Sequence, residues 1–303
     1  MPEWLRVYLS GVLMGAADIV PGVSGGTIAF IVGIYDRLIG ALSQVNGEAL
    51  KLLRQRNLKG VWRHFDGTFL LVLVLGIGSS IFTLAGVMSE LLANSPILLW
   101  SFFFGLILAS AYILLKMIPQ KHSATWLLML LGGVVGAVLS LLVPTQVTVN
   151  TPMVFFSGVI AICAMILPGI SGSFILLMLG MYGYVITAIK TLDLFTIAVF
   201  AAGAVVGLLS FAKVLNYLLH QHRSHTLALL TGIMLGALVK VWPWKMTLET
   251  IQVGDKTIPA VEARMLPWQL PEFQMIGDLL IPLVLMLLGA GLVILLEKVS
   301  SRK

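Results

Sequence analysis

The sequence has very little of what a soluble protein uses to contact water. Charged residues make up 11% of its 303 positions, whereas soluble domains carry roughly 25%. Hydrophobic residues make up 59%, and the mean hydropathy is +1.02. These values exclude a soluble domain for most of the chain and indicate a polytopic helical membrane protein, with apolar runs long enough to cross about 30 Å of hydrocarbon.

Residues suited to metal binding or catalysis are also scarce. The single cysteine, Cys163, excludes an internal disulfide framework and a cysteine metal cluster. The sequences GVSG from Gly22 and GISG from Gly169 resemble the GxSG around the serine of rhomboid-type intramembrane proteases, which needs a base. All five histidines fall in predicted loops or at helix ends: His64, His122, His220, His222 and His225. We therefore expect neither enzyme activity nor a cofactor.

One apolar segment occurs twice. GVLMGAADIVPGVSGGTIAFIVGIYDR, from Gly11, aligns without a gap with GVIAICAMILPGISGSFILLMLGMYGY, from Gly158, and later apolar runs repeat in the same order. The chain is thus predicted to be one ancestral unit duplicated, as residues 1–145 and 150–303. A duplicated, glycine-interrupted apolar segment is the best sequence pointer to the binding site of a transporter.

The predicted fold class is an all-α polytopic membrane protein with an inverted repeat. Each unit contains one re-entrant helical hairpin and three transmembrane helices. Unit one has its hairpin at 5–40 and helices at about 68–89, 97–118 and 126–142; unit two has its hairpin at about 152–188 and helices at about 194–219, 226–242 and 278–297. Each hairpin arm would cover only about 20 Å as a helix, too short to span alone. The alternative is that each motif segment is a kinked spanning helix, with glycines for close packing.

Basic residues indicate the orientation. The 41–66 loop contains five Lys and Arg residues, the 116–122 and 220–225 loops and the C-terminal tail are also basic, and the 143–152 connection has no charge. The positive-inside rule therefore places both termini on the cytoplasmic side of the membrane. The segment from Trp242 to Gln274 is predicted to be a polar external loop.

The paired turns are predicted to bind an anion. Pro and Gly end the first arm, and Ser or Thr can cap the second, which places helix starts with free N–H groups near the bilayer midplane. Glycine lets an anion approach the backbone closely. A structural role for each hydroxyl, through back-bonding to its own helix, is the alternative. The candidate phosphate-binding residues are Pro21, Gly22, Ser24, Gly25, Gly26, Thr27, Arg37, Pro168, Gly169, Ser171, Gly172, Ser173 and Lys213.

Asp18 is the candidate for ion coupling. A carboxylate inside a membrane is costly and is a functional hypothesis by default. The equivalent residue in the second copy is Met165, so a proton or sodium site is predicted in unit one only. The alternative is a carboxylate that pairs structurally with Arg37, with Lys213 or with a helix start. Arg37 alternatively marks the positive inner boundary, and Lys213 alternatively snorkels to the interface.

The stretch MGAADIVPGVSGGTIAFIVGIYDRLI resembles the signature of a bacterial and archaeal membrane family, the PopT type, once catalogued as a domain of unknown function. The DedA family is a more distant analogy. The resemblance covers essentially the whole chain. It implies a location in the bacterial inner membrane. It also implies transport of undecaprenyl phosphate or a related polyprenyl phosphate from the outer to the inner leaflet, which recycles the lipid carrier for cell-wall synthesis.

That substrate is consistent with the predicted site, since it joins an anionic phosphate to an apolar chain. We expect the phosphate to pass between the turns while Asp18 couples the step to a cation, in a protein that is expected to form a homodimer. The alternatives are a secondary transporter of a small soluble anion and a structural membrane protein.

Overall fold

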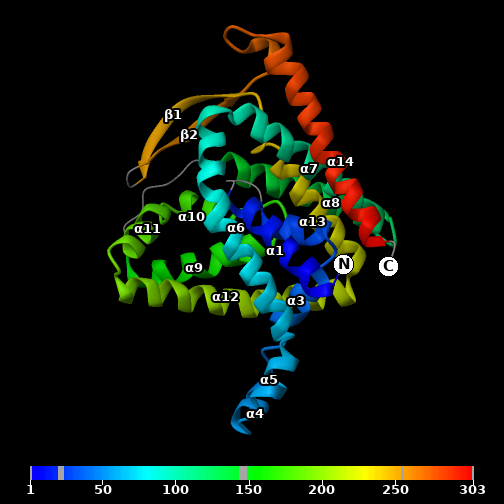
Figure 1. Ribbon diagram of the computed structural model, residues 1–303, viewed down its shortest axis with the longest axis vertical. Helices are drawn as coiled ribbons and strands as arrows, with labels where there is room; N and C mark the ends of the chain where they lie inside the picture. The colour runs from blue at the N-terminus through cyan, green and yellow to red at the C-terminus, as the bar shows by residue number, and fades with distance from the viewer. Residues whose placement is uncertain (1, 20–23, 143–148, 254–255, 302–303) are drawn as a thin grey trace.

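The computed structural model describes residues 2–19, 24–142, 149–253 and 256–301, and most of them are helical (Figure 1). The helices are α1 (Glu3–Ile19), α2 (Gly25–Ile31), α3 (Tyr35–Ser43), α4 (Gly47–Arg54), α5 (Leu58–His64), α6 (Gly67–Asn94), α7 (Pro96–Met117), α8 (Ser123–Leu141), α9 (Thr151–Ile166), α10 (Gly172–Met178), α11 (Tyr182–Lys190), α12 (Leu194–Gln221), α13 (Arg223–Ala237), the 3₁₀ turn η1 (Pro267–Gln269), the π-helical turn η2 (Met275–Leu280) and α14 (Ile281–Ser301). Among the described residues, five helices are long and apolar enough to cross a membrane, or up to seven spans if each bent helix pair counts as one. The protein is a multi-pass membrane protein.

A helix lies at each of the six predicted spans, although the ends differ by a few residues. Five of these helices have the length and hydropathy of a membrane span. The sixth, α13, ends at Ala237 rather than near residue 242. The chain turns over residues 238–241 instead.

Each predicted hairpin has a second break that the sequence interpretation missed. The predicted second arm, expected to be one helix, is two: α2 and α3 are bent by 118°, and α10 and α11 by 109°. In the first copy Gly33 has a φ of 73°, and the Ile34 N–H bonds to the Ala29 carbonyl at 2.9 Å. Gly180, with a φ of 66°, closes α10 in the same way. Such Schellman ends require left-handed backbone, which glycine adopts without a steric penalty.

Four helix pairs form most of the packing: α1 with α6, α9 with α12, α7 with α14 and α8 with α13. The first two pairs lie within the predicted units. In the other two, the second spanning helix of one unit packs on the third of the other. Glycines line these contacts, because a Cβ at Gly105 would overlap the Met286 carbonyl and one at Gly289 would overlap the Phe102 carbonyl. Close backbone approach of this kind is how helices associate in lipid, where apolar burial supplies little driving force.

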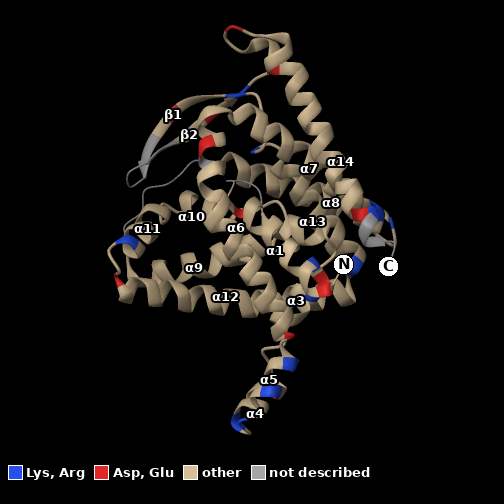
Figure 2. Ribbon diagram, in the orientation of Figure 1, with Lys and Arg blue, Asp and Glu red and all other residues tan. Residues whose placement is uncertain are grey.

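A basic helical segment and a β-hairpin lie at opposite ends of the molecule. At one end, α4 and α5 project from the bundle and carry several Lys and Arg side chains, whereas the central helices carry few charges (Figure 2). At the other end, β1 (Lys245–Val253) and β2 (Lys256–Arg264) form an antiparallel hairpin (Figure 1). The hairpin lies in the segment from Trp242 to Gln274 that was predicted to be a polar external loop, and it adds a strand pair to the predicted all-α fold. The residues of β1 include Thr247, Thr250, Ile251 and Val253, and such β-branched residues favour strands.

Candidate substrate site at the paired turns

The two glycine-rich turns contact each other near the centre of the protein. The Ser24 hydroxyl donates to the Met165 carbonyl at 2.9 Å, and the Gly169 backbone N–H donates to the Thr27 hydroxyl at 2.9 Å. Ser24 and Thr27 are both fully buried. The structure therefore joins serine and threonine of the first copy to the backbone of the second, as the paired motifs suggested.

Tyr35 is a further link between the copies that the sequence interpretation did not include in the site. Its hydroxyl donates to the Ile166 carbonyl at 3.1 Å, and its ring stacks on Phe30 with centroids 3.7 Å apart. A signal was present in the sequence, since Tyr182 occupies the equivalent position in the second copy. Gly26 lies at the same contact, where a Cβ would approach the Ile166 carbonyl to 2.5 Å.

Asp18 lies against the start of α2. Its Oδ1 accepts a hydrogen bond from the Gly25 N–H at 2.7 Å, while the Ser24 hydroxyl accepts from the Gly26 N–H at 3.1 Å. A Cβ at Gly25 would lie 2.6 Å from Asp18 Oδ2, so only glycine allows this approach. Of the arrangements considered for Asp18, this is the pairing with a helix start. A negative carboxylate there interacts favourably with the helix dipole.

The second turn is built differently. Ser171 makes no side-chain cap on α10, and its hydroxyl instead shares a hydrogen bond with that of Ser173 at 2.9 Å. Gly169 has a φ of 87°, and a Cβ there would lie 2.9 Å from the Met234 Cα. Gly172 lies equally close to α9, where a Cβ would be 2.6 Å from the Ala161 carbonyl. Pro168 is buried. The second copy thus presents two paired hydroxyls and no carboxylate.

Four predicted residues lie away from this contact or outside the described chain. Arg37 pairs with Glu3 and with Asp66, each at 2.6 Å. Lys213 is exposed on α12. The structure therefore brings neither cation to the turns. Pro21 and Gly22 lie outside the described residues.

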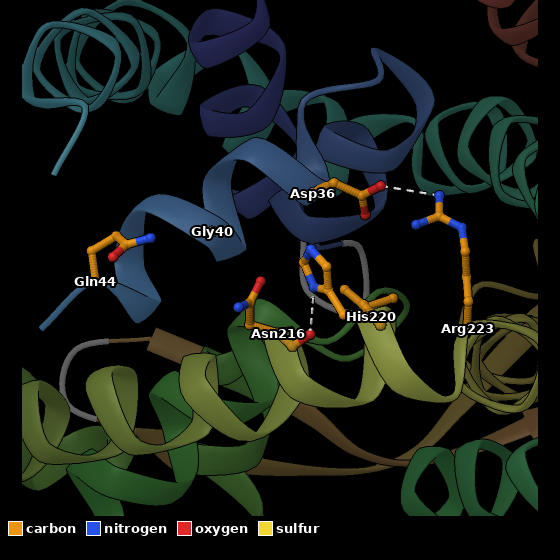
Figure 3. A pocket seen from close by; sticks show the side chains of 7 residues that line it. Asp36, Gly40, Gln44, Asn216, His220 and Arg223 are labelled. Atoms are coloured by element: carbon orange, nitrogen blue, oxygen red, sulfur yellow. Dashed lines mark hydrogen bonds and ion pairs between the residues drawn. The ribbon is translucent and has the colours of Figure 1, made fainter. Parts of the chain in front are cut away.

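A second polar feature lies between α3, α12 and α13. A cavity of about 230 Å³ is lined by Asp36, Gly40, Gln44, Asn216, Leu219, His220 and Arg223. Arg223 pairs with Asp36 at 3.0 Å across its mouth, and the His220 ring contacts the Asn216 carbonyl (Figure 3). The ion pair connects α3 of the first predicted unit to α13 of the second. Among the described residues, no group of three or more His, Cys, Asp and Glu could hold a metal ion.

The paired turns place hydroxyl groups and one carboxylate inside an apolar protein. The N–H groups of Gly25, Gly26 and Gly169, which the sequence suggested would be free, are bonded within the turns. Hydroxyls donate hydrogen bonds to anionic oxygens. The carboxylate opposes an anion by Coulomb repulsion, which is strong at low dielectric, unless it binds a proton or a cation. An anion at these turns would therefore face both the hydroxyl donors and the Asp18 carboxylate.

Comparisons with known proteins identify the family of the chain. Residues 14–257 match the VCA0040-like family, described as undecaprenyl phosphate translocase-like. A polyprenyl-phosphate transporter of Vibrio cholerae is 46% identical over 99% of this chain and 98% of its own length. A polyprenyl-phosphate transporter of Staphylococcus aureus is 32% identical over 80% of this chain and 87% of its own length. No solved structure matches the chain.

The resemblance found in the sequence is therefore confirmed. The family description and the names of both relatives are those of transporters and not of enzymes. The chain belongs to the undecaprenyl phosphate translocase-like family of membrane transporters.

Proposed function

We propose that the protein translocates undecaprenyl phosphate, or a related polyprenyl phosphate, from the outer to the inner leaflet of the cytoplasmic membrane and so recycles the lipid carrier. One observation carries the substrate: the polyprenyl-phosphate transporter of Vibrio cholerae is 46% identical over 99% of the chain. The direction follows from the recycling role that the family resemblance implies.

The proposed architecture is an inverted repeat of two re-entrant hairpins with both termini in the cytoplasm. Three features support it. The two motif segments are broken into helices in the same order, α7 and α8 of the first unit pack on α14 and α13 of the second, and the α4–α5 segment is basic. On this arrangement the first hairpin enters from the cytoplasm and the second from outside. Rocking of one unit against the other would then give alternating access.

The proposed path takes the phosphate between the paired turns while the prenyl chain stays in lipid. Ser24, Thr27, Ser171 and Ser173 supply hydroxyl donors, and the glycines keep the two backbones close. In the arrangement seen here, the Ser24 and Thr27 hydroxyls bond across the turns. Passage of a phosphate would break these bonds and replace them with bonds to its oxygens.

Asp18 is the proposed coupling residue. While it is charged, it bonds to Gly25 and repels a second anion from the turn. Binding of a proton or another cation removes that repulsion, which links phosphate entry to cation entry. The second copy has Met165 at this position, so one cation site would serve both turns.

The function is tested in a strain that lacks its other recyclers of undecaprenyl phosphate. Deletion of this protein should increase undecaprenyl phosphate on the outer surface, measured with a probe that does not cross the membrane. The wild-type protein should restore the low level. An unchanged surface level on deletion, with uptake of a soluble anion lost instead, would overturn the proposal in favour of a soluble-anion transporter.

A further inference from the structure

A buried ionic cluster lies beside the second turn and takes no part in the site described above. We define the lysine cluster as Lys240, Lys245 and Glu262. Glu262 pairs with the Lys240 Nζ at 3.0 Å and with the Lys245 Nζ at 3.2 Å. The side chains of Lys240, Lys245 and Glu262 are 18%, 6% and 16% exposed.

The cluster sits between the β-hairpin and the transport site. The Lys240 Nζ lies over the Phe174 ring, 4.9 Å from its centroid. Phe174 is the residue after Ser173 in α10. Lys245 lies over the Trp100 ring at 4.2 Å and donates to the Lys240 carbonyl at 2.9 Å. Glu262 comes from β2, so the hairpin completes the cluster.

The charges of the cluster do not balance. Two ammonium groups share one carboxylate, and the exposed guanidinium of Arg264, which donates to the Val239 carbonyl at 2.7 Å, adds to the positive potential. Burial lowers the pKa of Lys245 to about 8; the Glu262 carboxylate opposes that shift, and the charge of Lys240 adds to it. Buried charges are costly unless they are paired. A phosphate monoester, with a charge of about −1.5 to −2 at neutral pH, matches the excess.

We propose that the lysine cluster is a binding site for a phosphate monoester and receives the lipid headgroup before it reaches the turns. Lys240 and Lys245 bind the phosphate oxygens, and Glu262 is the anion that the phosphate displaces. The identity of the lipid rests on the proposed function, whereas the phosphate chemistry rests on the cluster itself. The same excess charge accounts for Lys240 and Lys245 on a side of the protein where the positive-inside rule predicts few basic residues.

A purely structural ion pair makes a different prediction. If the cluster only fastens the hairpin to the bundle, loss of Glu262 and loss of a lysine should have the same effect on binding. If Glu262 competes with phosphate, Glu262→Gln should preserve or tighten phosphate binding while Lys240→Gln and Lys245→Gln weaken it. The opposite signs distinguish the two roles.

The test measures binding of undecaprenyl phosphate, undecaprenol and inorganic phosphate to the full-length protein in lipid nanodiscs. Each lysine-to-glutamine change should weaken phosphate-lipid binding about tenfold, as expected for loss of a charge-assisted hydrogen bond. Undecaprenol binding should not change in these variants. Lys121→Gln, at an exposed loop lysine at the far end of α7, is the control and should bind as the wild type does. Lys245→Arg keeps the charge and should retain binding. If Lys245→Gln does not fold, the test compares Lys240→Gln, which should lose binding, with Lys245→Arg, which should keep it.

Two outcomes would overturn the inference. One is wild-type affinity for the phosphate lipid in both Lys240→Gln and Lys245→Gln. The other is equal weakening of binding by Glu262→Gln and by these two lysine variants. A third outcome separates the inference from the proposed function. If inorganic phosphate binds and undecaprenyl phosphate does not, and the lysine variants abolish phosphate binding, the cluster stands as a phosphate site. The lipid would then not be the substrate, and the proposed function would fail.

Discussion

The Thr27 hydroxyl accepts a hydrogen bond from the Gly169 backbone N–H at 2.9 Å, although the two residues are 142 positions apart in the chain. Thr27 belongs to the first copy of the duplicated segment and Gly169 to the second. The bond is buried, so neither partner has water as a substitute. It shows that the two copies of the segment contact each other directly.

Thr27→Val tests the importance of this contact. Valine keeps the shape of threonine but leaves the Gly169 N–H without its acceptor, which should destabilise the protein by about 1–3 kcal/mol. The melting temperature of the purified protein in detergent should fall, and transport should fall with it. Thr27→Ser retains the hydroxyl and is the matched control; a serine variant as unstable as the valine variant would contradict the role of the bond.

Asp18→Asn tests ion coupling. Asparagine can still accept a hydrogen bond from the Gly25 N–H, so the protein should fold with a melting temperature close to that of the wild type. It cannot bind and release a proton, so transport in proteoliposomes should fall by about tenfold or more and should no longer respond to an imposed cation gradient. Full activity with an intact gradient response would remove Asp18 from the mechanism and leave it as a structural cap.

Helix packing at the glycine contacts gives a prediction about stability. In Gly105→Ala the added methyl would overlap the Met286 carbonyl of α14, and overpacking of this kind costs about 1–3 kcal/mol. Gly78→Ala, on α6, is the control, since nothing lies within 4 Å of a Cβ there. It should be neutral or stabilising by up to about 1 kcal/mol, because alanine favours a helix more than glycine does. Equal melting temperatures for the two variants would mean that α7 and α14 are less closely packed than described.

Hydropathy and internal similarity predicted much of the fold. The spans around α6, α7, α8, α12 and α14 could be read from apolar runs, because the bilayer imposes a minimum length on each. The short helices α2 and α10 could not. Their ends depend on left-handed glycines, Gly33 and Gly180, and a glycine in an apolar run equally indicates close helix packing.

Internal similarity also pointed to part of the contact between the two turns. Ser24 and Gly169 were recognisable because the duplication repeats them as Ser171 and Gly22. Thr27 aligns with Phe174 and was chosen only as a possible cap of the second arm. The lysine cluster was not, since Lys240 and Glu262 are separated by 22 positions and meet only because β1 and β2 pair. Arg37 was placed at the site on charge alone, and Glu3 and Asp66 hold it elsewhere. Charge complementarity across a fold cannot be read from spacing along the chain.

The last prediction concerns the titration of Lys245. As the pH rises, the stability contribution of Lys245 should increase and phosphate binding should decrease. Burial lowers the pKa of Lys245 to about 8 from 10.5. The groups that face it are Glu262 and Arg264 from β2 and Lys240 from the turn after α13. Between about pH 8 and 10.5 the unfolded chain binds a proton that the folded protein has lost, so the contribution of Lys245 to the free energy of unfolding rises with pH in this window. Phosphate binding should fall over the same window, because the neutral amine no longer attracts the anion.

The experiment measures the affinity for undecaprenyl phosphate and the melting temperature from pH 7 to 9.5. A phosphate monoester is largely a dianion throughout this range, since its second pKa is about 6, so a change in affinity reports on the protein. Lys245→Arg stays charged over the whole range and should bind with little pH dependence, which makes it the matched control. Loss of affinity together with loss of stability would instead point to general unfolding, and an unchanged affinity would exclude Lys245 as a phosphate ligand.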